Sequence, residues 1–243
     1  MTRFFVSAQQ IQPNFITLSG ENAAHANVLR LKAGEQVLVC DGGGNECVCT
    51  VSDISKEQVC LVVQKRQTSQ SEACVDVCVY IAFPKADKLE HVIQKATELG
   101  ANRIVAFPSA RCVSRPDEKS LMKKLERWQK IAASAAEQSG RGRIPQVLVL
   151  NSFQEAVEQA VQSDLPILFY ENEKATSLSM ALENGHFKTV SIMTGPEGGL
   201  DEKEVCAAKQ AGMKICTLGK RILRCETAPL CALSAIMYHC GEF

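Results

Sequence analysis

Apolar residues form short runs along the first part of the chain, separated by polar and turn-forming residues. Five runs rich in valine, cysteine and phenylalanine are typical of strands and cover residues 3–6, 14–18, 35–40, 46–53 and 58–66. The segment "DGGGN" at 41–45 suits a hairpin turn, and one helix-like stretch at 20–31 interrupts the series. This pattern predicts a small β-barrel or sandwich, followed by a polar linker at 67–73.

After this linker, apolar runs alternate with amphipathic segments. The runs predicted as strands cover 75–83, 103–108, 146–150, 165–171, 189–194 and 214–218. Helical spacing covers 85–100, 118–140, 152–161, 201–212 and 226–240, with a further apolar stretch at 176–183. The alternation predicts an α/β domain with a mostly parallel sheet covered on both faces, whose ligands bind beyond the carboxyl ends of the strands.

Composition supports an ordinary globular protein and argues against disorder, since 46% of residues are hydrophobic and 22% are charged. The net charge is +0, so a nucleic-acid partner would require locally gathered basic residues. The start of the chain lacks the apolar core of a signal peptide, and no stretch approaches the length of a membrane span. We therefore expect a cytoplasmic protein with no membrane partner.

The 12 cysteines show no C-x-x-C spacing. Several of them lie among valines and are expected to be small apolar residues of strands, namely Cys47, Cys49, Cys60, Cys74 and Cys78. The histidines form no zinc-like spacing with cysteine; they are His25, His91, His186 and His239. We favour structural thiols over redox chemistry and expect no metal.

Two loops between a predicted strand and a predicted helix carry candidate chemistry. They are "TGPEGGL" at 194–200, followed by the capping-box pair Asp201 and Glu204, and "TLGKRILRCETAP" at 217–229, where Pro229 fits a first helical turn. The first loop matches neither a P-loop nor a G-x-G-x-x-G fingerprint. Both contain a glutamate, which disfavours a polyphosphate and suits a cationic ligand such as S-adenosylmethionine. A simple tight turn in the first loop and a surface pair of Arg224 with Glu226 remain the alternatives.

A third feature is basic, because residues 111–143 carry nine Lys or Arg against four Asp or Glu. Helical spacing directs Leu121, Leu125, Trp128, Ala132 and Ala135 inward and leaves Lys123, Lys124, Arg127 and Lys130 outside. A solvated helix face and a nucleic-acid surface explain this helix equally well. The arginines of "GRGRIP" at 140–145 suit a loop that contacts phosphate.

The chain contains four runs in this order: "KLEHVIQKATELGA", "WQKIAASAAEQSGRGRIP", "TGPEGGL" and "LGKRILRCETA". In sequence and in order, these runs resemble the 16S ribosomal RNA uracil-N3 methyltransferases of the SPOUT superfamily. The early "HANVLRLKAGEQVLVCDGGG" is similar to the same family's N-terminal module. The resemblance implies a PUA-like β-barrel that binds RNA at 1–70 and a SPOUT domain with a trefoil knot at 71–243. It also implies a homodimer that methylates N3 of a uridine in 16S rRNA of the assembled small ribosomal subunit.

The resemblance further implies the site residues. Those carried over for the cofactor, S-adenosylmethionine, are Tyr170, Glu171, Thr194, Gly195, Pro196, Gly199, Leu218, Gly219, Ile222, Leu223, Arg224 and Thr227. For catalysis we expect Arg224 to stabilise a uracil anion, and Glu226 or Glu197 to accept a proton or orient water. For RNA phosphates we expect His25, Arg30, Lys32, Arg111, Arg141 and Arg143. Cys225 departs from the family pattern, in which a threonine or similar residue is expected.

Three alternatives stay open on the sequence. Another SPOUT-type enzyme could methylate a different base or a ribose 2′-oxygen. A non-catalytic ribosome-assembly factor could retain the fold, although the intact "TGPEGGL" and "RILRCETA" speak against it. A thiol-based redox or metal protein is the third.

Overall fold

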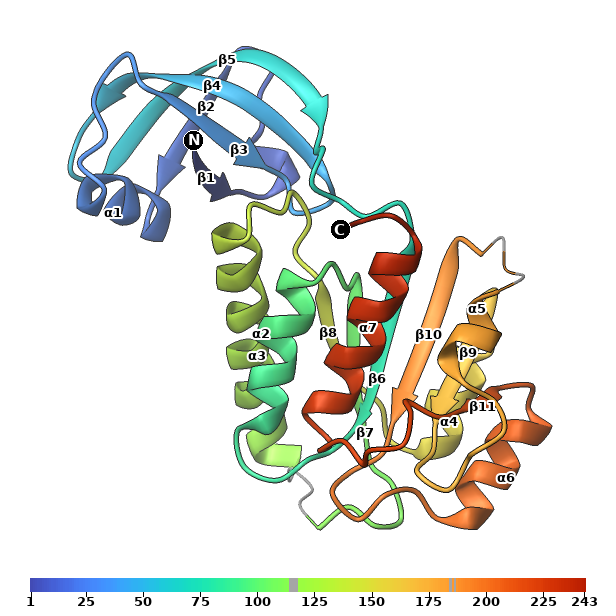
Figure 1. Cartoon of the computed structure of the whole chain (residues 1–243). Helices are drawn as coiled ribbons and strands as arrows, with labels where there is room; N and C mark the ends of the chain where they lie inside the picture. Colours follow the sequence, from blue (N-terminus) through green and yellow to red (C-terminus); the bar gives the residue numbers. More distant parts are fainter. Residues whose placement is uncertain (114–117, 184, 186) are drawn as a thin grey trace. The chain divides into compact units, whose positions relative to one another are not determined.

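The computed structural model describes residues 1–113, 118–183, 185 and 187–243 (Figure 1). These residues form two compact units, here called unit 1 (1–72 with 136–144) and unit 2 (73–135 with 145–243). His186 and the 114–117 part of the basic segment lie outside the described residues.

Unit 1 is built on a curved five-stranded sheet (Figure 1). In sheet order its strands are β1 (Thr2–Phe5), β3 (Gln36–Cys40), β4 (Asn45–Ile54), β5 (Gln58–Thr68) and β2 (Phe15–Ser19). The β1–β3 pair is parallel and the other pairs are antiparallel. The predicted strands are confirmed, but β1 and β2 remain edges, so the described sheet is an open half-barrel. The helix α1 (Glu21–Val28) and the 3-10 turn η1 (Ala8–Gln10) complete the unit.

The register of β4 and β5 corrects the predicted linker. Asn45 pairs with Thr68, and Glu46 pairs with Gln67. The strand therefore continues through the first residues of the segment predicted as a linker, because β4 supplies backbone partners there.

The predicted turn at 41–45 joins β3 to β4 as a hairpin. Gly42 and Gly44 have φ of 75° and 103°, which favour glycine. The Asp41 carboxylate accepts hydrogen bonds from the backbone amides of Gly43 (2.7 Å) and Asn45 (3.1 Å). These local bonds fix the turn within unit 1.

The segment 140–144 packs in unit 1 instead of forming a free phosphate-binding loop. Arg141 is only 2% exposed, and its Nη2 donates to Glu72 Oε2 at 2.6 Å. Glu72 Oε1 also accepts from the backbone amides of Gly142 (2.9 Å) and Arg143 (3.0 Å). Burial and the Glu72 carboxylate already engage the guanidinium group of Arg141, which disfavours its predicted phosphate contact.

Unit 2 contains a six-stranded sheet in which all neighbours are parallel. In sheet order its strands are β11 (Lys214–Cys216), β9 (Leu165–Phe169), β10 (Thr189–Thr194), β6 (Asp76–Ala82), β7 (Arg103–Phe107) and β8 (Gln146–Val149). The helices are α2 (Lys88–Glu98), α3 (Glu118–Gln138), α4 (Phe153–Ala160), α5 (Leu178–Leu182), α6 (Glu202–Gln210) and α7 (Thr227–His239). The predicted parallel α/β sheet is confirmed.

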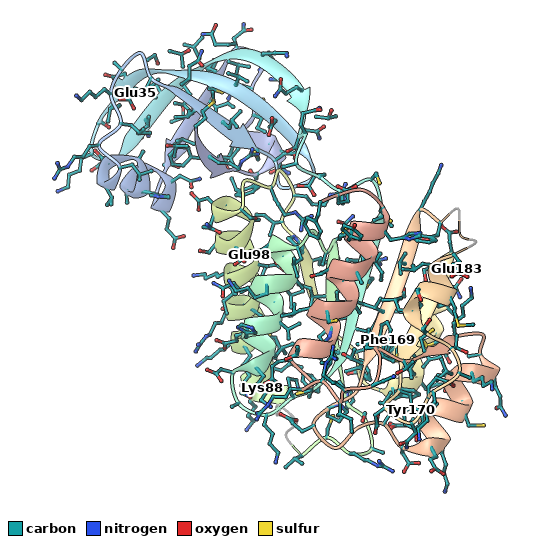
Figure 2. All side chains as sticks on the ribbon, in the orientation of Figure 1. Glu35, Lys88, Glu98, Phe169, Tyr170 and Glu183 are labelled. Carbon is teal, nitrogen blue, oxygen red and sulfur yellow. The ribbon has the colours of Figure 1, made fainter. Side chains whose placement is uncertain are left out.

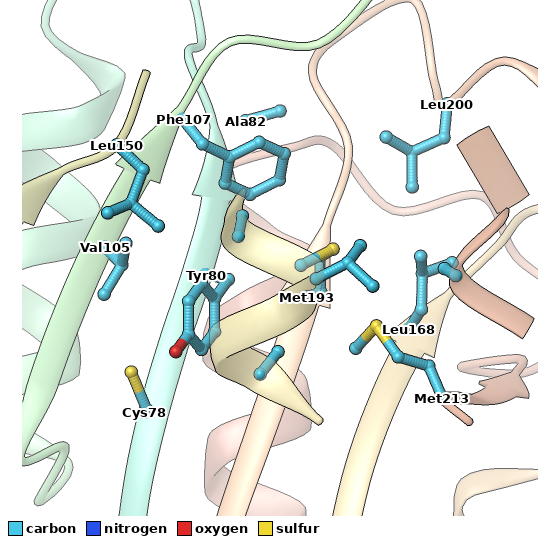
Figure 3. Close-up of a cluster of buried hydrophobic side chains, with 14 of the residues drawn as sticks. Cys78, Tyr80, Ala82, Val105, Phe107, Leu150, Leu168, Met193, Leu200 and Met213 are labelled. Atoms are coloured by element: carbon cyan, nitrogen blue, oxygen red, sulfur yellow. The ribbon is translucent and has the colours of Figure 1, made fainter. Parts of the chain in front are cut away.

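Buried side chains cover both faces of this sheet, as predicted. On one face Tyr80 packs in a cluster with Phe107 and Met193, together with residues of α4 and α6 (Figure 3). The alternate residues Val79 and Ile81 of β6 are fully buried on the opposite face, where α7 packs against β6 and β10. Each central strand is therefore apolar on both sides, which explains its continuous hydrophobic sequence.

The long helix α3 shows the predicted division of its surface. Trp128, Ala132 and Ala135 are buried, while Leu121 and Leu125 are partly buried. The basic side chains predicted outside are all exposed, namely Lys123, Lys124, Arg127 and Lys130. Arg127 also pairs with Glu90 of α2 at 2.7 Å, so part of the basic face is neutralised within unit 2.

The cysteines largely behave as small apolar residues. Cys47, Cys49 and Cys78 are buried in strands, and Cys60 is partly buried in β5. Cys74 is exposed in the segment before β6, so its predicted place in a strand is wrong. Among the residues described, no helix is long and apolar enough to span a bilayer.

Replacing Arg141 with methionine should lower the free energy of unfolding by about 3 kcal/mol, because the Glu72 carboxylate would lose its buried cationic partner. Urea denaturation of the full chain measures the change. Lys65→Met, at an exposed position of β5, is the control and should shift the free energy by less than about 0.5 kcal/mol. Equal stability of Arg141→Met and the unaltered protein would contradict the structural role of this ion pair.

Candidate active site

The carboxyl ends of three adjacent strands, β9, β10 and β11, open onto one cavity of about 520 Å³ in unit 2. The residues lining it come from the end of β9, from the loop 194–199 after β10, and from the segment 217–225 after β11. Lys88 of α2 also lines it, and Figure 2 shows Lys88, Phe169 and Tyr170 at the same end of the unit. This is the expected ligand position in a parallel α/β sheet.

Most of the residues predicted for a cofactor are brought together here. Those lining the cavity are Tyr170, Glu171, Thr194, Gly195, Pro196, Gly199, Leu218, Gly219, Ile222, Leu223 and Arg224. Thr227 begins α7 and is not among the lining residues of the described chain. The Tyr170 hydroxyl accepts a hydrogen bond from Asn172 Nδ2 at 3.0 Å.

The loop after β10 needs glycine at two positions because a side chain there would meet neighbouring protein atoms. A Cβ on Gly195 would lie 3.0 Å from Leu200 Cγ and 3.1 Å from the Gly199 carbonyl carbon. Gly199 has φ of +68°, and a Cβ there would collide with Glu171 Oε1. The loop ends in the predicted capping box, in which Glu204 accepts from the Asp201 amide at 3.0 Å. Helix α6 thus fixes the end of the loop.

Thr194 supplies a polar group without a partner in the described part of the chain. Its residue is 2% exposed, and its Oγ1 makes no hydrogen bond there. Buried hydroxyls are normally hydrogen-bonded, so an orphaned hydroxyl in a cavity wall indicates a position that a ligand completes.

Lys88, which the sequence reasoning missed, connects the two candidate carboxylates. Its Nζ lies 2.9 Å from Glu197 Oε1 and 3.2 Å from Glu226 Oε2. The backbone amide of Lys85 donates to the same Glu197 oxygen at 3.0 Å. Lys88 occupies the first turn of a predicted helix after a central strand, and that position was the signal that could have found it.

These contacts keep both carboxylates ionised. Partial burial by itself would raise the pKa of Glu197, but hydrogen bonds from Lys88 and the Lys85 amide outweigh it and lower this pKa to about 2. The pKa of Glu226 is also lowered, since hydrogen bonds from its own amide, Cys225 and Lys88 outweigh its desolvation. The hydrogen bond to Glu197 raises the pKa of Lys88. The cluster therefore carries two negative charges and one positive charge at neutral pH.

Cys225 lies between Arg224 and Glu226, where the resemblance led us to expect a threonine or similar residue. Its Sγ donates to Glu226 Oε2 at 3.2 Å, and burial, followed by that hydrogen bond, raises its pKa to about 12. Cys225 as a residue is 7% exposed. It acts here as a neutral hydrogen-bond donor, because thiolate formation is disfavoured.

Arg224 is exposed and lines the cavity without an ion pair in the described structure. The alternative of an Arg224–Glu226 surface pair is wrong, since Glu226 is bound by Lys88 instead. A free guanidinium group at the cavity mouth is available to an anionic or hydrogen-bonding substrate.

The remaining residues predicted for RNA lie in different settings. Arg30 and Lys32 are exposed, and Arg143 is partly buried. His25 Nδ1 lies 3.2 Å from Glu137 Oε1, which places a carboxylate beside it. Arg111 donates hydrogen bonds to the Gly198 carbonyl and to Asp201, each at 3.3 Å, and these bonds restrain the glycine-rich loop at 194–200.

No cluster of three or more metal-ligating side chains occurs in the part of the chain that the structure describes. All 12 cysteines lie in that part and are free thiols.

Comparisons with known proteins agree with this geometry. Residues 71–237 match the family described as RNA methyltransferase domain, and residues 18–64 match the RNA methyltransferase PUA domain. The chain is 39% identical to ribosomal RNA small subunit methyltransferase E of Bacillus subtilis (strain 168), over 98% of this chain and 96% of the relative.

Two solved structures extend the likeness. The Neisseria gonorrhoeae ribosomal RNA small subunit methyltransferase E, bound to S-adenosyl methionine, superposes with a TM-score of 0.83 at 32% identity and covers 98% of this chain and 97% of its own. A Legionella pneumophila structure with the bound cofactor SAM gives a TM-score of 0.84 at 28% identity and covers 98% of each chain. The chain therefore belongs to the RNA methyltransferase family that includes the ribosomal RNA small subunit methyltransferases E.

Proposed function

We propose that this protein transfers a methyl group from S-adenosylmethionine to N3 of a specific uridine in 16S rRNA, within the assembled small subunit. The observation that carries the proposal is the cavity at the ends of β9, β10 and β11, where two glycine-containing loops meet and Arg224 remains free. Family membership and the gonococcal relative, which binds S-adenosyl methionine, support the cofactor and the RNA substrate.

The residues of the cavity fit this cofactor. A volume of about 520 Å³ lies in the range of small-ligand sites. Glu171 and Glu197 line the wall and suit a cation, while Leu218, Ile222 and Leu223 offer apolar surface to a purine. The orphaned Thr194 hydroxyl can hydrogen-bond to a polar group of the ligand.

Bound S-adenosylmethionine supplies an electrophilic methyl group on a sulfonium. The protein's task is to hold uracil N3 in line with that methyl group, which replaces a bimolecular encounter by a fixed geometry. Arg224 stabilises the negative charge that uracil gains as its N3 proton leaves. Its exposed guanidinium group lines the cavity, and we propose that a splayed-out base of the RNA enters the cavity beside it.

Glu226 and Glu197 are better suited to orientation than to proton acceptance. A carboxylate with a pKa of about 2, such as Glu197, is a weak base toward the much less acidic imide of uracil. Glu226 shares the same Lys88 ammonium, which also weakens its basicity. We assign these carboxylates to orienting water or the cofactor, with the imide proton passing to solvent.

RNA phosphates are bound outside the cavity by exposed basic residues. The exposed Arg30 and Lys32 of unit 1 are the leading candidates, and Arg143, which is partly buried, is a further one. His25 and Arg111 contribute less, because Glu137 and Asp201 already lie beside them. Such contacts position the protein without reading sequence.

The finer features of the family fold are also proposed. We infer a SPOUT-type trefoil knot in unit 2, which is supported by the return of the chain from edge strand β11 to α7 on β6 and β10. We infer a homodimer, which is supported by an open groove lined by parts of α5 and α7. Tyr238 and Phe243 of this groove are 73% and 69% exposed, and large exposed apolar patches favour association.

Mass spectrometry of nucleosides tests the reaction directly. Purified protein, labelled S-adenosylmethionine and unmodified small subunits should yield labelled 3-methyluridine. Label in a ribose 2′-O-methyl nucleoside would refute the N3 assignment. Failure to bind cofactor or transfer label to subunits or naked RNA would favour a non-catalytic assembly factor.

Arg224→Ala should lower kcat at saturating substrate by about 100-fold, because a fixed donor to the developing anion is lost. Cofactor affinity, measured by calorimetry, should change by less than about threefold if the charge acts on uracil. Arg224→Lys retains the charge and should recover part of the rate. Full turnover by Arg224→Ala would eliminate the electrostatic role.

The double variant Arg30→Gln/Lys32→Gln should flatten the slope of log K against log salt by about 1.5 to 2, as expected when two phosphate contacts are lost. Filter binding to 16S rRNA at several salt concentrations measures the slope. Lys65→Gln/Lys214→Gln removes the same charge from exposed positions elsewhere and serves as the control. Equal slopes for the two double variants would show that Arg30 and Lys32 make no special contact.

A further inference from the structure

The ammonium group of Lys88 joins three segments that are far apart in sequence. It comes from the start of α2, Glu197 from the loop after β10, and Glu226 from the end of the segment before α7. The contacts span 109 residues between Lys88 and Glu197 and 137 residues between Lys88 and Cys225, whose Sγ lies 3.7 Å from Nζ. Both loops that line the cavity therefore have one common attachment point.

This arrangement differs from the ordinary surface ion pair. The side chains of Lys88, Glu197 and Glu226 are 26%, 26% and 20% exposed, so solvent screens them only in part. A second donor, the Lys85 amide, holds Glu197 from the same side. Networks of several charges restrain geometry better than isolated pairs.

We propose that Lys88 is a positioning residue for methyl transfer, which holds Glu197 and Glu226 together and thereby sets the spacing of the two loops around the cavity. The role rests on the proposed methyltransferase function of this cavity. Nothing else in the described structure ties the two carboxylates together.

Loss of the ammonium would leave two like charges facing each other. Their repulsion would separate the loops, and it would also favour protonation of one carboxylate, as happens when two acids share a site. In the described residues no neighbouring cation takes part in the contacts that Lys88 makes. Cys225 is a neutral donor, and Arg111 is engaged by Gly198 and Asp201. Lys220, Arg221 and Arg224 line the cavity but pair with neither carboxylate, and Glu171, near Gly199, adds negative charge.

Hydrogen–deuterium exchange of the free protein tests the positioning role without cofactor or activity. In Lys88→Met the peptides covering 194–200 and 217–226 should exchange at least about threefold faster than in the unaltered protein, because both loops lose their attachment. Lys88→Arg keeps the charge and should retain most of the protection.

Lys95→Met is the matched control, since Lys95 pairs with Glu98 in the same helix at 2.8 Å and does not line the cavity. It should leave both loops unchanged. Unchanged exchange of the loops in Lys88→Met would overturn the proposal. Should that variant fail to fold, Glu226→Gln removes one contact and should accelerate exchange in 217–226; unaltered exchange there would overturn the proposal equally.

The pH dependence of single-turnover methyl transfer gives a second readout. In the unaltered protein hydrogen bonds from Lys88 lower the pKa of Glu197 and of Glu226, whereas in Lys88→Met the repulsion between them raises the pKa of one carboxylate. Protonation of one carboxylate relieves that repulsion, so the rate ratio of Lys88→Met to the unaltered protein should rise as the pH drops from about 8 to about 5, whereas the ratio for Lys88→Arg should stay constant. A constant ratio for Lys88→Met would contradict the role. Absence of methyl transfer by the unaltered protein would instead refute the proposed function and leave the exchange result to decide the role of Lys88.

Discussion

Parallel pairing of β11, β9, β10 and β6 places the carboxyl ends of four neighbouring strands at one edge of the sheet. Each strand therefore delivers its following loop to the same region, and the cavity consists of these loops. The pairing depends on strands that are buried on both faces, since residues such as Val79 and Tyr80 face opposite sides and neither is more than 2% exposed. The site is a consequence of the sheet core.

Within that edge, side-chain size and charge decide what the loops can do. Gly195 and Gly199 keep the chain where a Cβ would meet Leu200 or Glu171. Lys88 then holds the carboxylates of the two loops next to each other, which lowers their basicity. Arg224, Lys220 and Arg221 line the same cavity without an ion pair in the described residues. Such a site can promote methyl transfer by positioning the reactants and by electrostatic stabilisation, and it contains no strong general base among these carboxylates.

Charge in unit 1 stabilises the structure, and it is also the source of the RNA contacts that we propose. Arg141 was predicted to bind phosphate because it lies between glycines in a basic segment. In the structure its side chain is buried and forms an ion pair with Glu72. Arg30 and Lys32 carry the same charge at exposed positions. A count of basic residues cannot separate these cases, because burial is settled by packing.

The sequence alone determined most of the secondary structure and the parallel sheet, because period-two runs, helical spacing and capping residues are local properties. It also indicated the glycine-rich loop, its capping box and the family. The open edges of the unit 1 sheet, the extension of β5 to Thr68, the burial of Arg141 and the exposure of Cys74 were decided only by the tertiary structure. The same is true of Lys88 between Glu197 and Glu226, since a contact across more than 100 residues depends on where folding places each end and leaves no local pattern in the chain.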